Sequence, residues 1–274
     1  MRIAICGMGL IGASIARALS SSTEIVGIDR DEKTIKDALR DSVITEGGNH
    51  IHMAKGCDLV IIALPVGAII KTARALMDCL EPGTVLTDTG STKLRIVDTI
   101  GPMWPWYVGS HPMAGNEDSG YNASRKDLFK DAMCILTPEG HTRKQSIQMV
   151  SEIWKACGAH IVTMPPGEHD ELMAVISHMP HLLSFVFMGI AENLKESKEI
   201  LGKGFRDFTR VAASDPVMWR DILIENRHNL TPLIDHYIRE LSMIRGYMED
   251  KDLDALENRL KIYRQSRRDL YNSH

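Results

Sequence analysis

A glycine-rich loop near the N-terminus constrains the fold of this chain more than any other feature. The loop, Gly7-Met8-Gly9-Leu10-Ile11-Gly12, directly follows an apolar segment over Arg2–Cys6 and leads into an alanine-rich segment with helical spacing. In such a strand–loop–helix unit, the glycines allow a tight turn, close approach of the backbone to a pyrophosphate and close helix–strand packing. The free N–H groups at the start of the helix attract phosphate. The loop therefore predicts a Rossmann-type fold that binds a dinucleotide.

The residues that end later strands indicate which dinucleotide binds. Asp29 ends the second predicted strand, 20 residues beyond Gly9. A carboxylate there can accept hydrogen bonds from both hydroxyls of the adenosine ribose and repel a 2′-phosphate, so NAD is favoured over NADP. The neighbouring Arg30, however, could partner such a phosphate. Leu64 and Pro65 end a later strand, and we expect them near the nicotinamide-side ribose because ligands bind at the carboxyl ends of such strands.

The chain up to about Met164 alternates short apolar runs with helical segments. This order predicts an α/β fold with a mainly parallel, doubly wound sheet covered on both faces. The predicted strands are Arg2–Cys6, Glu24–Asp29, Asp58–Leu64, Thr84–Thr87, Trp106–Gly109, Met133–Thr137 and His160–Met164, and the predicted helices include Ile11–Ser20, Glu32–Arg40, Val66–Leu80 and Lys144–Ala156. Pro165-Pro166-Gly167 then breaks the pattern, which indicates a dinucleotide-binding domain over residues 1–165 and a second domain over 166–274.

The second domain is predicted to be all-α. Residues 168–194 are apolar around much of the helix circumference, which is typical of a helix at the centre of a bundle or a dimer. Pro180 should kink or interrupt this helix, and Ser214-Asp215-Pro216 is a typical helix start. Because 168–194 also contains histidines and carboxylates, we expect a buried helix and no membrane span. The apolar surface exceeds what one small bundle needs, which favours a homodimer through this domain.

Composition and charge exclude several classes of protein. The chain has 274 residues, of which 44% are hydrophobic and 25% charged, as in a soluble protein with a full core. The net charge of −4 argues against nucleic-acid binding, so an anionic substrate must be met by a few placed cations. The five cysteines include no C-x-x-C pair, and the first strand begins at Arg2, which leaves no room for a signal peptide. We therefore expect a cytoplasmic protein with reduced thiols.

Polar residues gather in three segments. Two follow predicted strands: residues 88–93 (Asp-Thr-Gly-Ser-Thr-Lys) and residues 109–117 (Gly-Ser-His-Pro-Met-Ala-Gly-Asn-Glu). In a doubly wound sheet, such strand ends form the ligand crevice. The third segment, Ser177-His178-Met179-Pro180-His181, lies in the helical part and is followed by residues 204–210.

Taken in order, these segments resemble the signature of the prephenate/arogenate (cyclohexadienyl) dehydrogenase family. That signature runs G-x-G-x-x-G, D-x-G-S-x-K, G-S-H-P-M-A-G-x-E, H-D before S-H-x-P-H, F-x-D-F-T-R and S-D-P-x-x-W. The later members correspond to His169-Asp170, Phe205–Arg210 and Ser214-Asp215-Pro216 with Trp219, so the matches extend from residue 7 to about residue 220. The resemblance implies a Rossmann domain followed by a helical dimerisation domain, with NAD and without a metal.

The resemblance also implies a reaction: NAD-dependent oxidative decarboxylation of prephenate to 4-hydroxyphenylpyruvate, for tyrosine biosynthesis. Hydride passes to the cofactor, and the ring becomes aromatic as carbon dioxide leaves. The alternative is arogenate dehydrogenase activity, which forms tyrosine directly and differs in recognising an ammonium group where prephenate has a keto group. Asp29, which suggests NAD, and His181, which can meet a carboxylate, favour prephenate.

Four residues are expected to carry this chemistry. His111 is the predicted general base or hydrogen-bond acceptor for the 4-hydroxyl, because an imidazole with a pKa of about 6.5 suits that task at neutral pH. Ser91 is expected to bond the same hydroxyl or to orient His111. Arg210 is expected to clamp a substrate carboxylate with its planar fork, although an ion pair with Asp207 is an alternative. His181 resembles the family's second substrate-binding histidine.

Other residues receive supporting roles. Glu117 is expected to gate the entrance or to pair with a cation across the cleft, and Trp219 to shape the pocket wall. His178 is expected to pack internally. His169 and Asp170 are interpreted as the start of the long helix, with Asp170 as a first-turn acid near the positive end of its dipole.

Three other readings are weaker. A metal site at His178 and His181 would lack a nearby carboxylate or thiolate motif. A β-hydroxyacid dehydrogenase would use a lysine on the long interdomain helix, whereas residues 168–194 contain none. A catalytically inactive NAD-binding sensor is disfavoured because Ser91, His111 and Arg210 are all present.

Overall fold

A computed structural model describes residues 1–115, 118–191 and 200–272. The chain divides into two compact units, Met1–Arg227 and His228–His274, which we describe separately. The predicted boundary between residues 165 and 166 lies inside the first unit, at the point where the last strand is followed by a series of helices.

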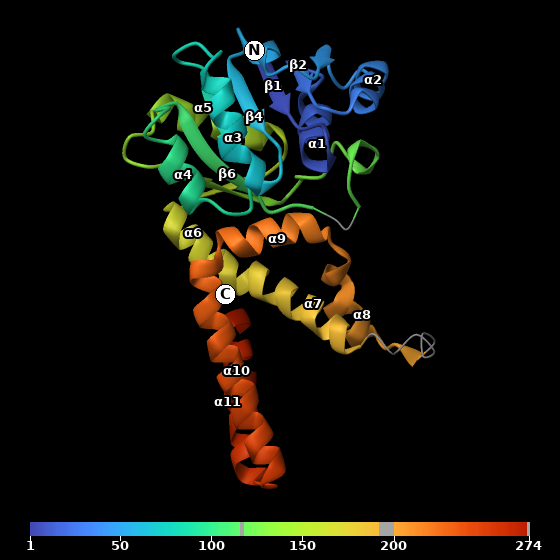
Figure 1. Cartoon of the computed structure of the whole chain (residues 1–274), viewed down its shortest axis with the longest axis vertical. Helices are drawn as coiled ribbons and strands as arrows, with labels where there is room; N and C mark the ends of the chain where they lie inside the picture. The colour runs from blue at the N-terminus through green and yellow to red at the C-terminus, as the bar shows by residue number, and fades with distance from the viewer. Residues whose placement is uncertain (116–117, 192–199, 273–274) are drawn as a thin grey trace. The chain divides into compact units, whose positions relative to one another are not determined.

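The described part of the first unit contains one eight-stranded sheet with the order β3-β2-β1-β4-β5-β6-β7-β8. Four of its strands, β1, β2, β4 and β6, are labelled in Figure 1. Neighbouring strands are parallel except for β6 and β7, which are antiparallel. The strands are β1 (Arg2–Cys6), β2 (Glu24–Ile28), β3 (Glu46–Gly48), β4 (Leu59–Ile62), β5 (Val85–Asp88), β6 (Tyr107–Pro112), β7 (Met133–Thr137) and β8 (His160–Thr163). The strand order reverses between β1 and β4, which is where doubly wound folds bind their ligands. The predicted fold class is confirmed.

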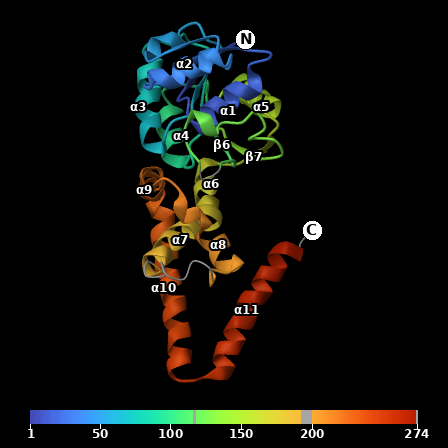
Figure 2. The same cartoon turned by 90° about the vertical axis from the view of Figure 1, so that its right-hand side faces the viewer.

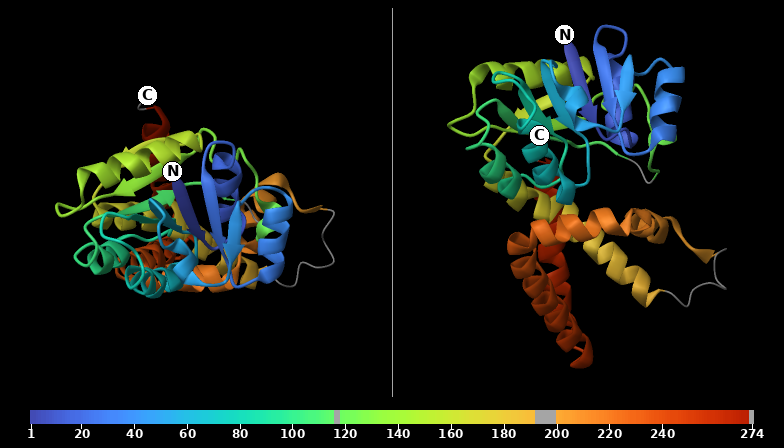
Figure 3. Two further views of the ribbon diagram at one scale, coloured as in Figure 1. Left: turned by 90° about the horizontal axis from the view of Figure 1, so that it is seen from above. Right: turned by 45° about the horizontal axis from the view of Figure 1, so that its top comes forward.

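Helices cover both faces of this sheet (Figure 3). Successive side chains of a strand point to opposite faces, and in β1 Ile3 and Ile5 belong to one core cluster whereas Ala4 and Cys6 belong to the other. Helices α1 (Leu10–Leu19), α2 (Glu32–Arg40) and α5 (Lys144–Ala156) contribute to the first cluster. Helices α3 (Val66–Met77), α4 (Leu94–Ile100) and α9 (Pro216–Glu225) contribute to the second. Burial on both faces explains why these strands are almost continuously apolar.

Strand β6 is longer than the sequence predicts, and this changes the place of His111. The prediction ended the strand at Gly109 and put His111 in the following loop. In the structure, residues 109–112 pair with β7, with His111 opposite Ile135. Gly109 is required there because a Cβ atom would overlap the hydroxyl of Thr137. His111 is therefore held by strand backbone, which orients a side chain more rigidly than a loop does.

Helices form the rest of the first unit (Figure 2). They are α6 (Pro166–Met173), the π-helical turn η3 (Ala174–His178), α7 (Met179–Ile190), α8 (Lys203–Thr209), the 3-10 turn η5 (Arg210–Ala213) and α9. Pro180 lies in the first turn of α7, directly after the π turn, so it marks the predicted irregularity. Asp215 caps α9 by accepting hydrogen bonds from Val217 and Met218, as the sequence predicts.

The helical run Pro166–Ile190 is long and apolar enough to cross a membrane, by length and composition alone. Only 28% of the most apolar 18-residue stretch of this run is buried within the chain. A single copy of the chain therefore does not bury this helix as the sequence predicts. Exposed apolar residues on it include Val175, Val186 and Ile190. The same run carries His169 and Asp170, both buried and hydrogen-bonded to the sheet part of the unit, which indicates a helix that belongs to the globular fold.

The second unit contains α10 (Arg227–Glu249) and α11 (Leu253–Asn272). Asp252 caps α11 by accepting a hydrogen bond from Ala255. An ion pair between Arg259 and Glu240 at 2.6 Å links the two helices, and the hydroxyl of Tyr263 donates to the same carboxylate. These contacts hold the two helices together as a hairpin.

Candidate functional site

The glycine loop has the geometry that dinucleotide binding requires. Gly7 has a φ of +96°, and a Cβ atom on it would overlap the carbonyl oxygen of Ala63. A Cβ atom on Gly12 would overlap the carbonyl oxygen of Gly7, whereas one on Gly9 would point into open space. Gly9 is the N-cap of α1 and provides no side-chain cap, so the first N–H groups of the helix stay available to an anion. The three glycines thus serve the turn, the approach of a pyrophosphate and the helix packing.

Asp29 lies directly against this loop. One carboxylate oxygen accepts a hydrogen bond from the backbone N–H of Met8 at 2.7 Å, and the other accepts from the N–H of Asp31 at 2.9 Å. Each oxygen has a second lone pair, so the carboxylate can still accept from ribose hydroxyls. Arg30 is exposed beside it, and Leu64 is close enough to touch a Cβ atom on Gly7. The structure thus brings the predicted cofactor residues together in a form that fits a dinucleotide.

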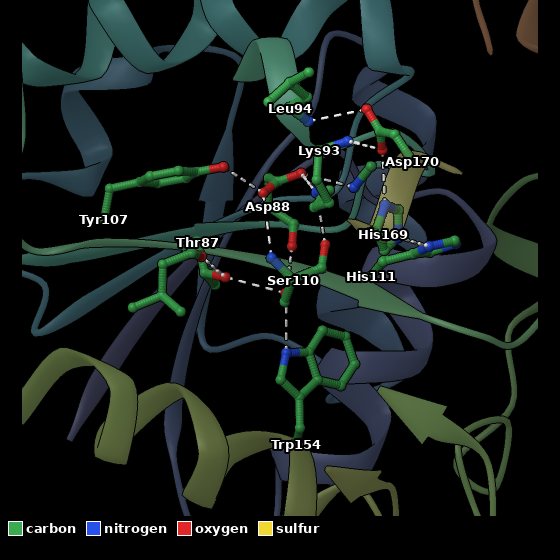
Figure 4. A network of polar contacts seen from close by, with 12 residues as sticks. Thr87, Asp88, Lys93, Leu94, Tyr107, Ser110, His111, Trp154, His169 and Asp170 are labelled. Atoms are coloured by element: carbon green, nitrogen blue, oxygen red, sulfur yellow. Dashed lines mark hydrogen bonds and ion pairs between the residues drawn. The ribbon is translucent and has the colours of Figure 1, made fainter. Parts of the chain in front are cut away.

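A buried polar network lies at the ends of β5 and β6 (Figure 4). Asp88 and Lys93 are completely buried and form an ion pair. Lys93 Nζ also donates to the carbonyl oxygen of Ser110 at 2.8 Å, and the hydroxyl of Tyr107 donates to Asp88 at 2.7 Å. Trp154 donates its indole N–H to the Ser110 hydroxyl at 3.1 Å. These bonds satisfy the buried charges and tie α4 to β6 beside His111.

The N-terminus of α4 holds the carboxylate of Asp170. One Asp170 oxygen accepts from the backbone N–H of Lys93 at 2.7 Å, and the other accepts from the N–H of Leu94 at 3.0 Å. The prediction that Asp170 interacts with the dipole of its own helix is wrong, because its carboxylate binds the start of a different helix. The first oxygen also lies 2.7 Å from Nδ1 of His169, and Nε2 of His169 lies 2.8 Å from Nδ1 of His111 (Figure 4).

Burial dominates the electrostatics of His111. Burial, and then the nearby His169, Lys93 and His178, lower the pKa of the His111 imidazole well below 6.5. Burial also lowers the pKa of His169, which is partly offset by its hydrogen bond to Asp170. Both imidazoles are therefore neutral at pH 7. A neutral His111 can accept a proton, as a general base must.

A second group of residues surrounds the start of α7. Asn226 donates its amide hydrogens to the carbonyl oxygen of Asp170 at 2.8 Å and to Nδ1 of His178 at 2.9 Å. Burial lowers the pKa of His178 to about 4. His181 is half-buried and stacks on Trp219, with 3.8 Å between ring centroids. Trp219 is buried beside His181, and its role as a pocket wall stays a prediction.

The remaining predicted residues lie around this group, with one exception. The backbone of Ser91 lies next to His178, and its side chain is partly buried. Burial lowers the pKa of His181, and the charge of Arg210 contributes to the same direction. Arg210 is exposed in η5. Glu117 lies outside the described residues.

Sequence reasoning missed several residues of the site. Asp88 and Lys93 were visible as the ends of the D-x-G-S-x-K segment, and two charged residues beside apolar strands could have been identified as a buried pair. His169 and Asp170 are interpreted from the sequence only as the start of the long helix, with Asp170 as a first-turn acid. Nothing in the sequence marked Asn226, because its partners are distant in the chain.

Comparisons with known proteins agree with this geometry. A family model of the prephenate dehydrogenase nucleotide-binding domain matches residues 13–163, and one of the prephenate dehydrogenase dimerization domain matches residues 165–262. Prephenate dehydrogenase of Bacillus subtilis (strain 168) is 38% identical over 266 residues, which are 93% of this chain and 72% of that protein. Cyclohexadienyl dehydrogenase of Zymomonas mobilis is 34% identical over 286 residues, covering 99% of this chain and 97% of that protein.

A solved structure is also similar over nearly the whole chain. The crystal structure of prephenate dehydrogenase from Aquifex aeolicus, in complex with hydroxyphenyl propionate and NAD+, has a TM-score of 0.89 and 31% sequence identity. The match covers 98% of each chain.

Proposed function

This chain belongs to the prephenate dehydrogenase family, and we propose that it converts prephenate to 4-hydroxyphenylpyruvate with NAD, as a step of tyrosine biosynthesis. The observation that carries this proposal is the state of His111. Its imidazole is buried and neutral at the end of β6, its Nδ1 faces His169, and its Nε2 is left for a substrate. This arrangement lies at the same edge of the sheet as the glycine loop.

The reaction removes a proton from the 4-hydroxyl and a hydride from the ring carbon that bears this hydroxyl. One group of the protein must therefore hold the proton. NAD, when bound, accepts the hydride from the ring carbon that bears the 4-hydroxyl. His111 accepts the hydroxyl proton, so the carbon–oxygen bond can become a carbonyl. When the ring carboxylate leaves as carbon dioxide, its bonding electrons complete the aromatic ring, and the oxygen takes the proton back from His111. The products are 4-hydroxyphenylpyruvate, carbon dioxide and NADH.

Residues of the glycine loop and the following strand ends bind the cofactor in this proposal. The backbone N–H groups of residues 9–12 hold the pyrophosphate, and Asp29 accepts hydrogen bonds from the adenosine ribose. Leu64 and Pro65 lie on the nicotinamide side. Arg30 stays in solvent, and the fixed Asp29 carboxylate disfavours the 2′-phosphate of NADP.

The substrate carries two carboxylates, and the chain meets them with few cations. Arg210 clamps one of them, and His181, stacked on Trp219, lines the same part of the pocket; the effect of the Arg210 charge on the pKa of His181 supports this pairing. Ser91 donates or accepts a hydrogen bond at the 4-hydroxyl. Glu117 is proposed to lie at the entrance.

The family's dimerization domain and the exposed apolar residues of α7 support a homodimer. We propose that residues 1–165 bind the dinucleotide and that residues 166–274 form the substrate and dimerisation part. The proposed location is the cytoplasm, with small molecules as the only other partners.

A steady-state comparison tests the proposal. Prephenate and arogenate are each assayed with NAD and with NADP, following the reduced cofactor and carbon dioxide together. We expect the highest kcat/KM with prephenate and NAD, and equal amounts of NADH and carbon dioxide. A higher kcat/KM with arogenate would replace prephenate by arogenate as the substrate, and no turnover of either compound would refute the proposal.

A further inference from the structure

The hydrogen bonds from Asp170 through His169 to His111 allow only one arrangement of protons when both imidazoles are neutral. Asp170 is a carboxylate that accepts from two backbone N–H groups, so His169 must donate its Nδ1 proton to it at 2.7 Å. The Nε2 atom of neutral His169 is then an acceptor. His111 must therefore carry its proton on Nδ1, which donates to His169 at 2.8 Å, and its Nε2 atom has a free lone pair.

We infer that His169 and Asp170 are positioning residues that set the tautomer of His111, so that Nε2 always presents a lone pair to the substrate hydroxyl. This inference rests on the proposed function for its catalytic meaning, but the tautomer itself is a property of the protein alone. The wrong tautomer would present an N–H group to the hydroxyl proton, and transfer to His111 would stop.

The anchoring of Asp170 gives this arrangement its rigidity. Its carboxylate is fixed by the N–H groups of Lys93 and Leu94 at the start of α4, and its backbone carbonyl accepts from Asn226 at 2.8 Å. Two backbone N–H groups donate to its two oxygens, so both oxygens act as acceptors. Asp170 therefore remains an acceptor, and His169 remains a donor at Nδ1.

The same chain of bonds stabilises the positive charge that His111 acquires when it takes the proton. His169 lies between that charge and the carboxylate of Asp170, so the imidazolium is neutralised through two hydrogen bonds. The other groups that face His111 do not provide this. Lys93, the N-cap of α4, is already paired with Asp88 of β5, and His178 at the end of η3 is neutral at pH 7.

The contact between His111 and His169 joins the two parts of the chain that the family models match. His111 lies in the segment matched by the nucleotide-binding family model, whereas His169 and Asp170 lie in the segment matched by the dimerization-domain model. The helical part therefore does more than bind substrate and a second copy: through α6 it determines the protonation of a side chain in the sheet.

The direct test is ¹⁵N NMR of the full-length enzyme with labelled histidine, with and without NAD, at pH 7. The His111 signal is assigned by its loss in His111→Asn. We expect a protonated Nδ1 and an unprotonated Nε2 on His111, and the same tautomer in His169→Gln, because a glutamine Oε1 atom can accept where Nε2 accepted. In His169→Leu, which has no acceptor there, we expect a mixture of tautomers.

Kinetics provide the second measurement on the same variants. In His169→Leu, kcat should fall by roughly 10²-fold or more, the size of a general-base effect, with KM for NAD unchanged. His169→Gln should recover at least a tenth of the wild-type kcat. His52→Gln and His52→Leu, at an exposed histidine, serve as matched controls and should behave as wild type.

Two results would overturn the inference: a proton on Nε2 of His111 in the folded wild-type enzyme, or equal losses of kcat in folded His169→Gln and His169→Leu. If His169→Leu does not fold, Asp170→Ala, which removes the acceptor of the His169 Nδ1 proton, replaces it. That variant should lower kcat and change the tautomer of His169, and an unchanged His169 tautomer would count against the inference. An enzyme that shows the expected tautomers but does not turn over prephenate would refute the proposed function and leave the inference intact.

Discussion

Nδ1 of His111 lies 2.8 Å from Nε2 of His169, although 58 positions separate these residues in the chain. The pair joins the end of a sheet strand to a helix of the following part, and it leaves one nitrogen of His111 for chemistry.

Replacement of His111 by Asn should remove the base without disturbing its support. An Asn amide can still donate toward His169 from the position of Nδ1, but it has no counterpart of Nε2. We expect kcat to fall by roughly 10²- to 10⁴-fold, with unchanged NAD affinity and thermal stability. Initial rates, NAD titration by fluorescence and a melting curve measure the three quantities. A kcat within threefold of wild type would refute the role of His111.

Asp170→Asn should lower the stability of the fold. The amide has one acceptor oxygen where the carboxylate has two, so an N–H group of Lys93 or Leu94 loses its partner in a buried site. We expect the free energy of unfolding to fall by about 1–3 kcal/mol, as measured by urea denaturation. Glu171→Gln, at the next position and exposed, is the control and should change it by less than about 0.5 kcal/mol.

Lys93→Met should leave Asp88 charged and unpaired in the core. Because both side chains are completely buried, we expect a loss of about 3–5 kcal/mol in the free energy of unfolding. Lys155→Met, on the exposed side of α5, is the matched control. Equal denaturation midpoints for the two variants would show that the Asp88–Lys93 pair does not stabilise the fold.

Asp29→Ser should change the preference between cofactors. The variant loses the carboxylate that repels a 2′-phosphate, and Arg30 is next to the vacated space. We expect KM for NAD to rise about tenfold, which is the effect of losing roughly 1.4 kcal/mol of binding, and KM for NADP to fall. Asp31→Ser, which keeps a capping side chain at the start of α2, should leave both values unchanged. An unaltered NAD/NADP ratio in Asp29→Ser would exclude Asp29 from ribose recognition.

Buried histidines predict how stability depends on pH. Burial lowers the folded-state pKa of His178 from 6.5 to about 4, and it also lowers those of His111 and His169. Below pH 6.5 the unfolded chain binds protons that the folded chain excludes, so the free energy of unfolding should fall as the pH drops from 6.5 towards 4. Above pH 6.5 these groups should have no effect. Urea denaturation at pH 7.5, 6, 5 and 4.5 measures the trend, and a flat profile would contradict it.

Local patterns were sufficient for most of the fold. Short apolar runs and helical spacing predicted β1, α2, β7 and α5 with the boundaries that the structure has, because the strands are buried on both faces and the helices on one. Strand β3 (Glu46–Gly48) was missed because two of its three residues are glycines, which carry no strand signal. The short helix α4 was also missed, although its first N–H groups turned out to hold Asp170.

The sequence by itself determined the glycine loop, Asp29, the segment that contains His111 and the family to which the chain belongs, because each depends on residues close together in the chain. Only the tertiary structure decided which side chains meet. Asp170 reaches the N–H of Lys93 across 77 positions, and Asn226 reaches His178 across 48. Such contacts depend on the path of the whole chain, which brings α4, α6 and α9 to one place, so no local pattern encodes them. His111 was identified from the sequence, but the side chains that determine its tautomer were found in the fold.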